Sequence, residues 1–469
     1  MGMTVLLIQP NVGMKDTGIQ INHGLAVLAA ALKENDFEVK LRIVDDLSYR
    51  KKIYLDDLRI KSLGLIAVTA YSNQWDCVKE IALSFKKIIG VPVICGGPHV
   101  TLFPEAIAQT DAIDAVIVGE GEIVFGRIAD CIQKEAQWRQ IPGVWTRNPD
   151  GTVSKNGVAP RVGNLDGLSF PDYEIYAREI LLNYPGIIFS RGCPYDCSYC
   201  CNHAYRRMYQ GDEFGVRFMS PGGAVAFAKY YKSTFSPSHL DIDDDTFTKN
   251  PRWLKEFLGG FKKEVGLPFN CNARPETINS EVVRWLRQSG CHTISVGVES
   301  GHEPLRQQLL KRRMTNQDII KAAEIIHKEG LKLSTFNMVG LPGETWNKFR
   351  ETVKLNQRIA PDRVQLAVYY PFRGTELGDY CYANNLVKRG AAAGSYFGKS
   401  ILRIPGFSRW RVILGYRLFK FWVYRKRSLW RALWELAKDS IKMFWFSDVL
   451  IGPYLRVKRY VMRREERLR

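Results

Sequence analysis

Apolar runs and amphipathic stretches alternate along the first 135 residues of the chain. Short apolar runs bounded by turn residues predict strands of a parallel sheet, because such strands are covered on both faces. We expect strands at 4–9, 39–44, 63–69, 91–95 and 115–118, and helices at 24–32 and 76–89. Strands that alternate with helices predict an α/β domain with helices on both faces of the sheet.

A second series of apolar runs begins near Gly186. Its six candidate strands lie at 186–190, 239–243, 268–273, 293–298, 332–339 and 363–370. Helical patterns between them include those at 250–265, 280–288 and 317–329. Repeated strand–helix units of this kind predict a (β/α)6 partial TIM barrel.

The segment between the two series lacks a strong helical period, so we expect a linker with small strands. The pattern divides the chain into a domain at 1–135, a linker at 136–180, a barrel domain at 181–385 and a helical segment at 386–469. Turn residues follow the predicted strands, and parallel sheets bind ligands at the carboxyl ends of their strands.

Composition changes this picture mainly at the C-terminal segment. The 469 residues are 46% hydrophobic and 25% charged, which excludes a largely disordered chain, a collagen-like repeat and a coiled coil. The net charge is +19, but residues 401–469 alone hold 18 Lys and Arg against 5 Asp and Glu, a net charge of +13. Five of the 11 Trp also lie there, so a basic, aromatic segment is joined to a nearly neutral body.

The start of the chain does not resemble a signal peptide, and no run of 18 apolar residues is present. We therefore expect a cytoplasmic protein. Ten Cys in such a chain point to metal or redox chemistry before disulfides.

Three of these cysteines, Cys193, Cys197 and Cys200, form a CxxxCxxC set directly after the first strand of the second series. Three thiolates on one loop at the mouth of a barrel can hold three irons of a [4Fe-4S] cluster and leave the fourth iron open. An open ligand position on a metal centre is typical of catalysis. A zinc site is the alternative, with His203 or Cys201 as the fourth ligand.

With this cysteine set the chain resembles the radical S-adenosylmethionine (SAM) superfamily. The resemblance implies that the open iron chelates SAM and that an electron from the cluster cleaves SAM to a 5′-deoxyadenosyl radical. Tyr199 stands where the family has an aromatic residue near the adenine, and Arg274 where an Arg reaches the SAM carboxylate. Glu299 is the implied acceptor for the ribose or amino group. The remaining strand ends that match are Asp243–Asp245, Ser300, Gly340, Gly343 and Glu344.

The first 135 residues resemble the flavodoxin-like (Rossmann-like) cobalamin-binding domain that precedes many radical SAM domains. The implied cobalamin-binding residues follow successive strands and are Asn11, Ser72, Gly96, Gly97, His99, Gly119 and Glu120. Glycines let the backbone approach a ligand closely. The DxHxxG motif, whose His ligates cobalt from below, is absent, so the lower face would meet a loop near Ser72 or Asn73. A degenerate domain without cobalamin is the alternative.

Methylthiotransferases share the barrel but carry a second cluster on N-terminal cysteines. Here Cys77, Cys95 and Cys131 are scattered singly and are interpreted as small core residues, so that family is not expected.

The C-terminal segment mixes aromatic and basic residues, as at 409–427, which suits a membrane interface. Plain packing on the barrel and RNA binding are the alternatives. We expect peripheral membrane contact through 401–469, on the inner face of the membrane, and no nucleic-acid partner.

Together the residues and the resemblance predict a cobalamin-dependent radical SAM methyltransferase. Its substrate would be an unactivated carbon of a lipid, lipid-linked or other small molecule, and its electron donor a flavodoxin or ferredoxin. A cyclase, oxidase or rearrangement enzyme with the same domains is one alternative. A corrinoid-binding regulator or membrane adaptor with an inactive barrel is another, against which the intact cysteine set argues.

Overall fold

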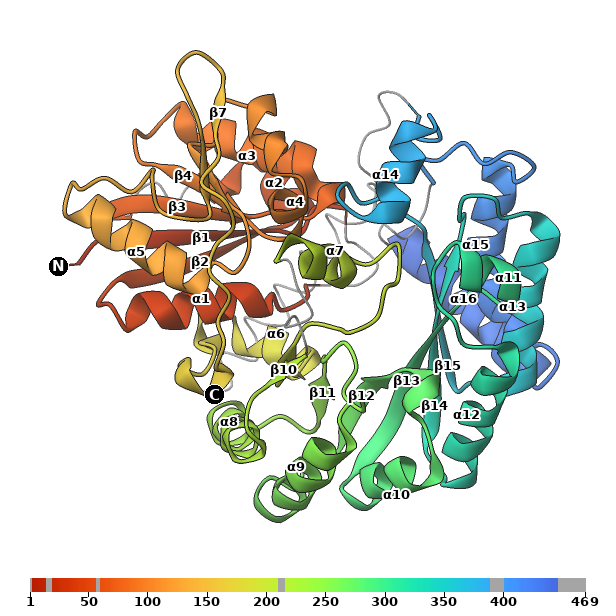
Figure 1. Ribbon diagram of the computed structural model, residues 1–469. Helices are drawn as coiled ribbons and strands as arrows, with labels where there is room; N and C mark the ends of the chain where they lie inside the picture. The colour runs from red at the N-terminus through yellow and green to blue at the C-terminus, as the bar shows by residue number, and fades with distance from the viewer. Residues whose placement is uncertain (1, 14–18, 56–59, 210–215, 389–399, 446–469) are drawn as a thin grey trace.

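The computed structural model describes residues 2–13, 19–55, 60–209, 216–388 and 400–445 (Figure 1). Its N-terminal sheet has seven strands in the order β2-β1-β3-β4-β5-β6-β7. They are β1 (Thr4–Pro10), β2 (Glu38–Val44), β3 (Leu63–Thr69), β4 (Val93–Gly96), β5 (Ala115–Ile117), β6 (Val144–Arg147) and β7 (Val153–Ser154). The first five pair in parallel, as expected from their apolar runs.

Helices cover both faces of this sheet (Figure 1). On one face lie α1 (His23–Lys33) and α5 (Glu122–Gln133), and on the other α2 (Asp46–Lys51), α3 (Trp75–Lys86) and α4 (Pro98–Leu102). The strand order reverses between β1 and β3, so the loops after these strands diverge. A crevice at such a switch point is where sheets of this type bind ligands.

The two last strands of the sheet lie in the predicted linker. β6 pairs antiparallel with β5, and β7 pairs antiparallel with β6. The expected small strands therefore hydrogen-bond to the N-terminal sheet instead of standing apart from it. After them the chain passes through α6 (Arg178–Asn183) into the second domain.

The second domain is a six-stranded sheet in the order β15-β14-β13-β12-β11-β8, with every pair parallel. Its strands are β8 (Gly186–Ile187), β11 (Leu240–Ile242), β12 (Phe269–Ala273), β13 (Cys291–Glu299), β14 (Lys332–Val339) and β15 (Arg363–Val368). The connecting helices are α8 (Pro221–Phe235), α9 (Pro251–Glu264), α10 (Ser280–Gln288), α11 (Glu303–Gln308), α12 (Asn316–Lys328) and α13 (Trp346–Ile359). The edge strands β8 and β15 do not pair, so the predicted partial barrel is confirmed.

One excursion leaves the barrel after β8. It begins and ends in a small antiparallel pair, β9 (Ser190–Arg191) and β10 (Arg217–Phe218), and contains α7 (Cys201–Met208). Figure 1 shows α7 between the N-terminal domain and the barrel.

The C-terminal helices α14 (Glu376–Ala383), α15 (Arg409–Tyr424) and α16 (Leu429–Trp445) follow the barrel. The face of α15 with Val412, Phe419 and Val423 is buried in an apolar cluster with β14, β15 and α13. The expected helical segment is thus present as far as residue 445, and part of it packs on the barrel. In the described portion of the chain, no helix is long and apolar enough to cross a membrane.

Candidate active site

The three predicted cluster cysteines lie on the loop between β9 and α7. The backbone N–H of Cys200 donates to the carbonyl of Cys197 at 3.0 Å, which folds the loop, and Cys200 is the N-cap of α7. Burial raises the pKa of the Cys193 thiol to about 11, so iron ligation would have to displace its proton. No three His, Cys, Asp or Glu among the described residues converge on a single metal ion. A [4Fe-4S] cluster needs no such convergence, because each thiolate binds a separate iron.

Two buried arginines point at the sulfur of Cys197. Arg274 Nη1 lies 3.3 Å and Arg312 Nη1 3.8 Å from Cys197 Sγ. Arg274 also pairs with Glu276 at 2.7 Å and lies over the ring of Tyr195. Two buried guanidinium groups that point at one sulfur suit an anionic occupant there, such as a thiolate-bound cluster or a carboxylate.

Arg312 connects the cluster loop to the end of β13. It donates to the Gly297 carbonyl, lies 3.4 Å from the Tyr199 hydroxyl and faces the Glu299 carboxylate at 4.0 Å. Burial would lower the pKa of Arg312, but Tyr199 and Glu299 raise it above its ordinary value. Sequence reasoning missed Arg312, because it lies in a loop with no strand-end motif.

Glu299 ends β13 in a strained conformation. Its φ of 61° is unusual for a residue with a side chain, and such strain is often kept where a site requires it. Burial raises the pKa of the Glu299 carboxyl, against the influence of Arg312 and Tyr199. The neighbouring Ser300 is fully buried and its carbonyl accepts from Arg306, so it shapes the turn.

The turn after β14 is held together by a buried carboxyl. Glu344 is fully buried, and its Oε2 accepts from the backbone N–H groups of Gly340 at 2.7 Å and Leu341 at 3.2 Å. Burial raises the pKa of Glu344 to about 8. Its carboxyl therefore stabilises the turn itself, while Gly343 takes a positive φ of 70°.

The acidic turn after β11 links the domains. Asp243 Oδ2 lies 3.1 Å from His23 Nε2 at the start of α1, and Tyr184 donates to Asp243 at 2.7 Å. Asp244 accepts from Phe189 N, and burial raises its pKa to about 7.

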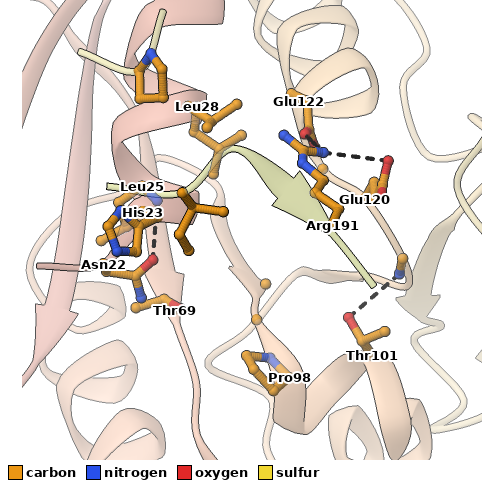
Figure 2. A pocket seen from close by; sticks show the side chains of 18 of the residues that line it. Asn22, His23, Leu25, Leu28, Thr69, Pro98, Thr101, Glu120, Glu122 and Arg191 are labelled. Carbon is orange, nitrogen blue, oxygen red and sulfur yellow. Dashed lines mark hydrogen bonds and ion pairs between the residues drawn. The ribbon is translucent and has the colours of Figure 1, made fainter. Parts of the chain in front are cut away.

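A cavity of about 530 Å³ lies between the domains. On the sheet side its lining includes four residues predicted to contact cobalamin: Gly96, Gly97, Gly119 and Glu120. A Cβ at Gly96 would meet nothing within 4 Å, so the backbone leaves open space there for a ligand. Figure 2 shows the wall of this cavity, with Thr69 from the end of β3 and Pro98 and Thr101 from α4.

Three other predicted contacts do not line the cavity. Asn11 donates its backbone N–H to Val44. Ser72 Oγ lies 3.0 Å from His99 Nδ1, and the His99 ring lies 4.8 Å from Trp75. Burial lowers the pKa of His99 to about 4, and its predicted contact with cobalamin stays a prediction.

The cavity is also lined by residues that were not predicted as site residues. The main ones are His23, Tyr71 and Glu122 from the N-terminal domain and Arg191, Tyr205, Tyr209 and Arg217 from the barrel domain. Glu122 shares a motif with Glu120, and Arg191 precedes the cysteine loop, so both could have been suspected. For Tyr205, Tyr209 and Arg217 the sequence offers no local pattern.

The family comparisons agree with this layout. Residues 12–129 match the B12 binding domain, and residues 187–355 match the radical SAM superfamily. These matches confirm the predicted family and support the predicted cobalamin, SAM and [4Fe-4S] cluster. The roles of the individual residues stay predictions.

Known proteins resemble the chain over most of its length. An uncharacterized methyltransferase of Pyrococcus horikoshii is 28% identical over 376 residues, 78% of this chain and 79% of that protein. The anaerobic magnesium-protoporphyrin IX monomethyl ester cyclase of Rubrivivax gelatinosus is 25% identical over 80% of this chain and 69% of its own. The methyltransferase TsrM of Kitasatospora setae, solved with cobalamin and a [4Fe-4S] cluster, has a TM-score of 0.66 at 18% identity. That alignment covers 86% of this chain and 83% of TsrM and shows a shared fold.

Proposed function

Because the chain belongs to the radical SAM enzymes that carry a cobalamin-binding domain, we propose that it is a methyltransferase acting on an unactivated carbon. The observation that carries this proposal is the cavity between the domains. Its lining includes both the glycine edge of the N-terminal sheet and the start of the cluster loop, at Arg191 and Gly192. The same cavity is therefore open both to a ligand of the N-terminal domain and to a ligand of the barrel domain.

The chemistry itself belongs to the cofactors. When bound, the cluster and SAM supply a radical that abstracts hydrogen, and cobalamin supplies the methyl group. Cys193, Cys197 and Cys200 would hold three irons, with Arg274 and Arg312 placing positive charge beside them. Gly96 and Gly97 would admit the cobalamin. The enclosing walls would keep water away from the reacting carbon.

A cyclase, oxidase or rearrangement activity is the second candidate, favoured by the similarity to the Rubrivivax gelatinosus cyclase. Product mass separates the two, since each methylation adds one CH₂. The test is anaerobic incubation of the cobalamin-loaded enzyme with lipid and metabolite extracts and with SAM that carries a deuterated methyl group. A product that gains the labelled methyl supports the proposal, whereas a changed product without label contradicts it.

The proposed electron donor is a small acidic protein such as a flavodoxin or ferredoxin. Its support is chemical, because a cluster that cleaves SAM must be reduced once per cleavage. Reduction of the cluster by flavodoxin, followed by its EPR signal, tests this partner.

Peripheral membrane contact is proposed for the C-terminal helices, since α16 turns an apolar face outward. Trp430, Leu433 and Trp434 lie at helical spacing on one face, and the two Trp are 85% and 68% exposed. Trp410 on α15 is 79% exposed. The exposed basic residues nearby are Arg409, Arg411, Arg417, Arg425, Lys426 and Arg427. Exposed Trp and Leu beside cations favour an anionic bilayer over RNA, because Leu offers nothing for a base to stack on.

Vesicle co-sedimentation of the full chain tests this contact. We expect binding to vesicles with 30% phosphatidylserine and at least a tenfold loss in W430S/W434S. The matched control is I88S/I123S, which removes two exposed apolar side chains from the N-terminal domain. Equal binding by both variants, or binding to RNA but not to vesicles, would contradict the proposal.

A further inference from the structure

Four charged side chains meet where the N-terminal domain touches the barrel. Arg191 Nη1 pairs with Glu122 Oε1 and lies 3.4 Å from Glu120 Oε2, as Figure 2 shows. Arg217 Nη2 pairs with Glu120 Oε1, and its Nη1 donates to Glu120 Oε2 at 3.1 Å. Two carboxylates face two guanidinium groups, so the charges balance within the cluster.

These pairs join two particular parts of the chain. Glu120 and Glu122 belong to the loop after β5 and the first turn of α5. Arg191 and Arg217 are direct partners in the β9–β10 pair. The described residues between them, 192–209 and 216, include the cysteine loop and α7. The carboxylates of one domain therefore hold both ends of the cluster-bearing excursion of the other.

Backbone contacts strengthen the same junction. Glu120 N donates to the hydroxyl of Tyr209, which directly follows α7, at 3.0 Å. Gly119 has a φ of 108°, and a Cβ there would lie 2.5 Å from the same hydroxyl, so only glycine permits this approach. Glu120 Oε2 also accepts from Val162 N at 2.8 Å. Both Glu120 oxygens are thus already engaged, which argues against a direct role in holding a ligand.

Burial makes these contacts costly to break. The side chains of Glu122 and Arg217 are only 9% and 10% exposed. Removing one partner of a buried pair leaves the other charge without compensation, which is strongly destabilising for that contact. Burial alone would raise the pKa of Glu120, but Arg217 and Arg191 hold it below its usual value.

We propose that Glu120 and Glu122 are positioning residues that clasp the β9–β10 pair, from which the cysteine loop extends, and thereby fix the distance between the [4Fe-4S] cluster and the cobalamin. The catalytic consequence rests on the proposed function, because a methyl transfer needs one substrate carbon within reach of both cofactors. Misplacement by about 1 Å can cost about 100-fold in rate. The clasp itself is a property of the fold and can be tested without substrate.

The test measures the magnetic dipolar coupling between cob(II)alamin and the reduced cluster in the holoprotein by EPR. We expect one narrow distance distribution in the unchanged protein. Glu120→Gln and Arg217→Gln should broaden or shift it alike, since they break the same contact from opposite sides. The double variant should add little to either single change. The control Glu105→Gln removes an exposed ion pair with Lys155 on the N-terminal domain and should change nothing.

Activity gives an independent second readout. In both clasp variants the amount of methylated product per 5′-deoxyadenosine formed should fall at least tenfold. An unchanged distance in both variants would overturn the proposal. It would also be overturned if Glu120→Gln alone lost cobalamin and Arg217→Gln behaved as the unchanged protein, since Glu120 would then contact the ligand. If no methylated product forms even in the unchanged protein, the proposed function fails while the distance measurement still decides the clasp.

Discussion

The surroundings of the cluster loop and the sheet side of the central cavity are built on different physical principles. At the cluster loop, Arg274 and Arg312 are buried against the sulfur of Cys197. Each of these arginines also faces one carboxylate, Glu276 or Glu299. On the sheet side, the lining includes several glycines and apolar side chains, a few uncharged polar ones such as Thr69 and Thr101, and two carboxylates that are already paired with arginines.

This difference indicates how each side selects its ligand. Buried guanidinium groups that point at a sulfur favour a negatively charged occupant, since such an occupant helps to offset their desolvation. Open space beside backbone favours a large group that is recognised by shape and surface contact. A substitution at the cluster loop should therefore impair the cluster and SAM cleavage, and a substitution on the sheet side should impair cobalamin binding.

The largest expected effect is on the barrel side. Cys197→Ala should abolish the cluster and all SAM cleavage, because only two of the three thiolates remain. Cobalamin binding should stay within about twofold, as the sheet side is intact. Iron and sulfide content, 5′-deoxyadenosine formation and the visible spectrum of cobalamin measure these three properties. Retained SAM cleavage in Cys197→Ala would contradict the cluster assignment. SAM cleavage by the unchanged protein would exclude a corrinoid-binding regulator, because an inactive barrel cannot cleave SAM.

Filling the sheet side should have the converse effect. Gly96→Leu places a side chain into the open space of the cavity without backbone strain. We expect cobalamin affinity to fall at least 100-fold, with iron content unchanged. The matched control is Gly90→Leu, which also adds a side chain in open space but outside the cavity. Normal cobalamin binding by Gly96→Leu would place the ligand elsewhere.

Arg312→Gln removes one cation while keeping hydrogen-bonding capacity. Hydrogen bonds to charged groups contribute about 1.5–3 kcal/mol, so SAM affinity should fall about 10- to 100-fold. The change that SAM causes in the EPR signal of the reduced cluster measures this affinity without turnover. Arg313→Gln, an exposed neighbour, is the control. Equal SAM affinity in the two variants would remove Arg312 from the site.

The smallest effect concerns Glu344, a buried carboxyl of the barrel whose hydrogen bonds run to backbone N–H groups. Burial raises its pKa from 4.5 to about 8, so the folded state binds this proton more tightly than the unfolded state. Its contribution is complete below pH 4.5 and is lost as the pH rises towards 8. A tenfold difference in proton affinity is worth about 1.4 kcal/mol.

At pH 9 we therefore expect Glu344→Gln to exceed the unchanged protein in stability by at least about 1.4 kcal/mol. At pH 4 the two should be similar. Urea denaturation across this range measures the difference. As a control, Glu256→Gln at an exposed position should show the same pH dependence of stability as the unchanged protein. If Glu344→Gln also showed that same pH dependence, the Glu344 carboxyl would be ionised in the folded protein and the prediction would be wrong.

The cluster loop and the domain junction also differ in how far their residues could be predicted from the sequence. The cysteine set and the strand-end glycines are local patterns, since a loop ligand set and a close backbone approach each depend on a few adjacent residues. Arg312, Arg217 and Tyr209 were missed because their neighbours in space are distant in sequence. The contacts that Glu120 and Glu344 make within the fold could not be predicted for a related reason: the same residue types serve a ligand or the fold, depending on what packs beside them.

By itself, the sequence determined the two domains, their order, the alternation of strands and helices and the CxxxCxxC spacing of the three cysteines predicted to hold the cluster. These depend on apolar periodicity and on spacing within short segments, which folding does not alter. Only the tertiary structure decided which charges are paired across the domain junction, which glycines face the cavity, and that α15 packs on the barrel while α16 exposes Trp430 and Trp434. The physical reason is that burial and charge compensation are properties of neighbours in space, and the chain brings those neighbours together only when it folds.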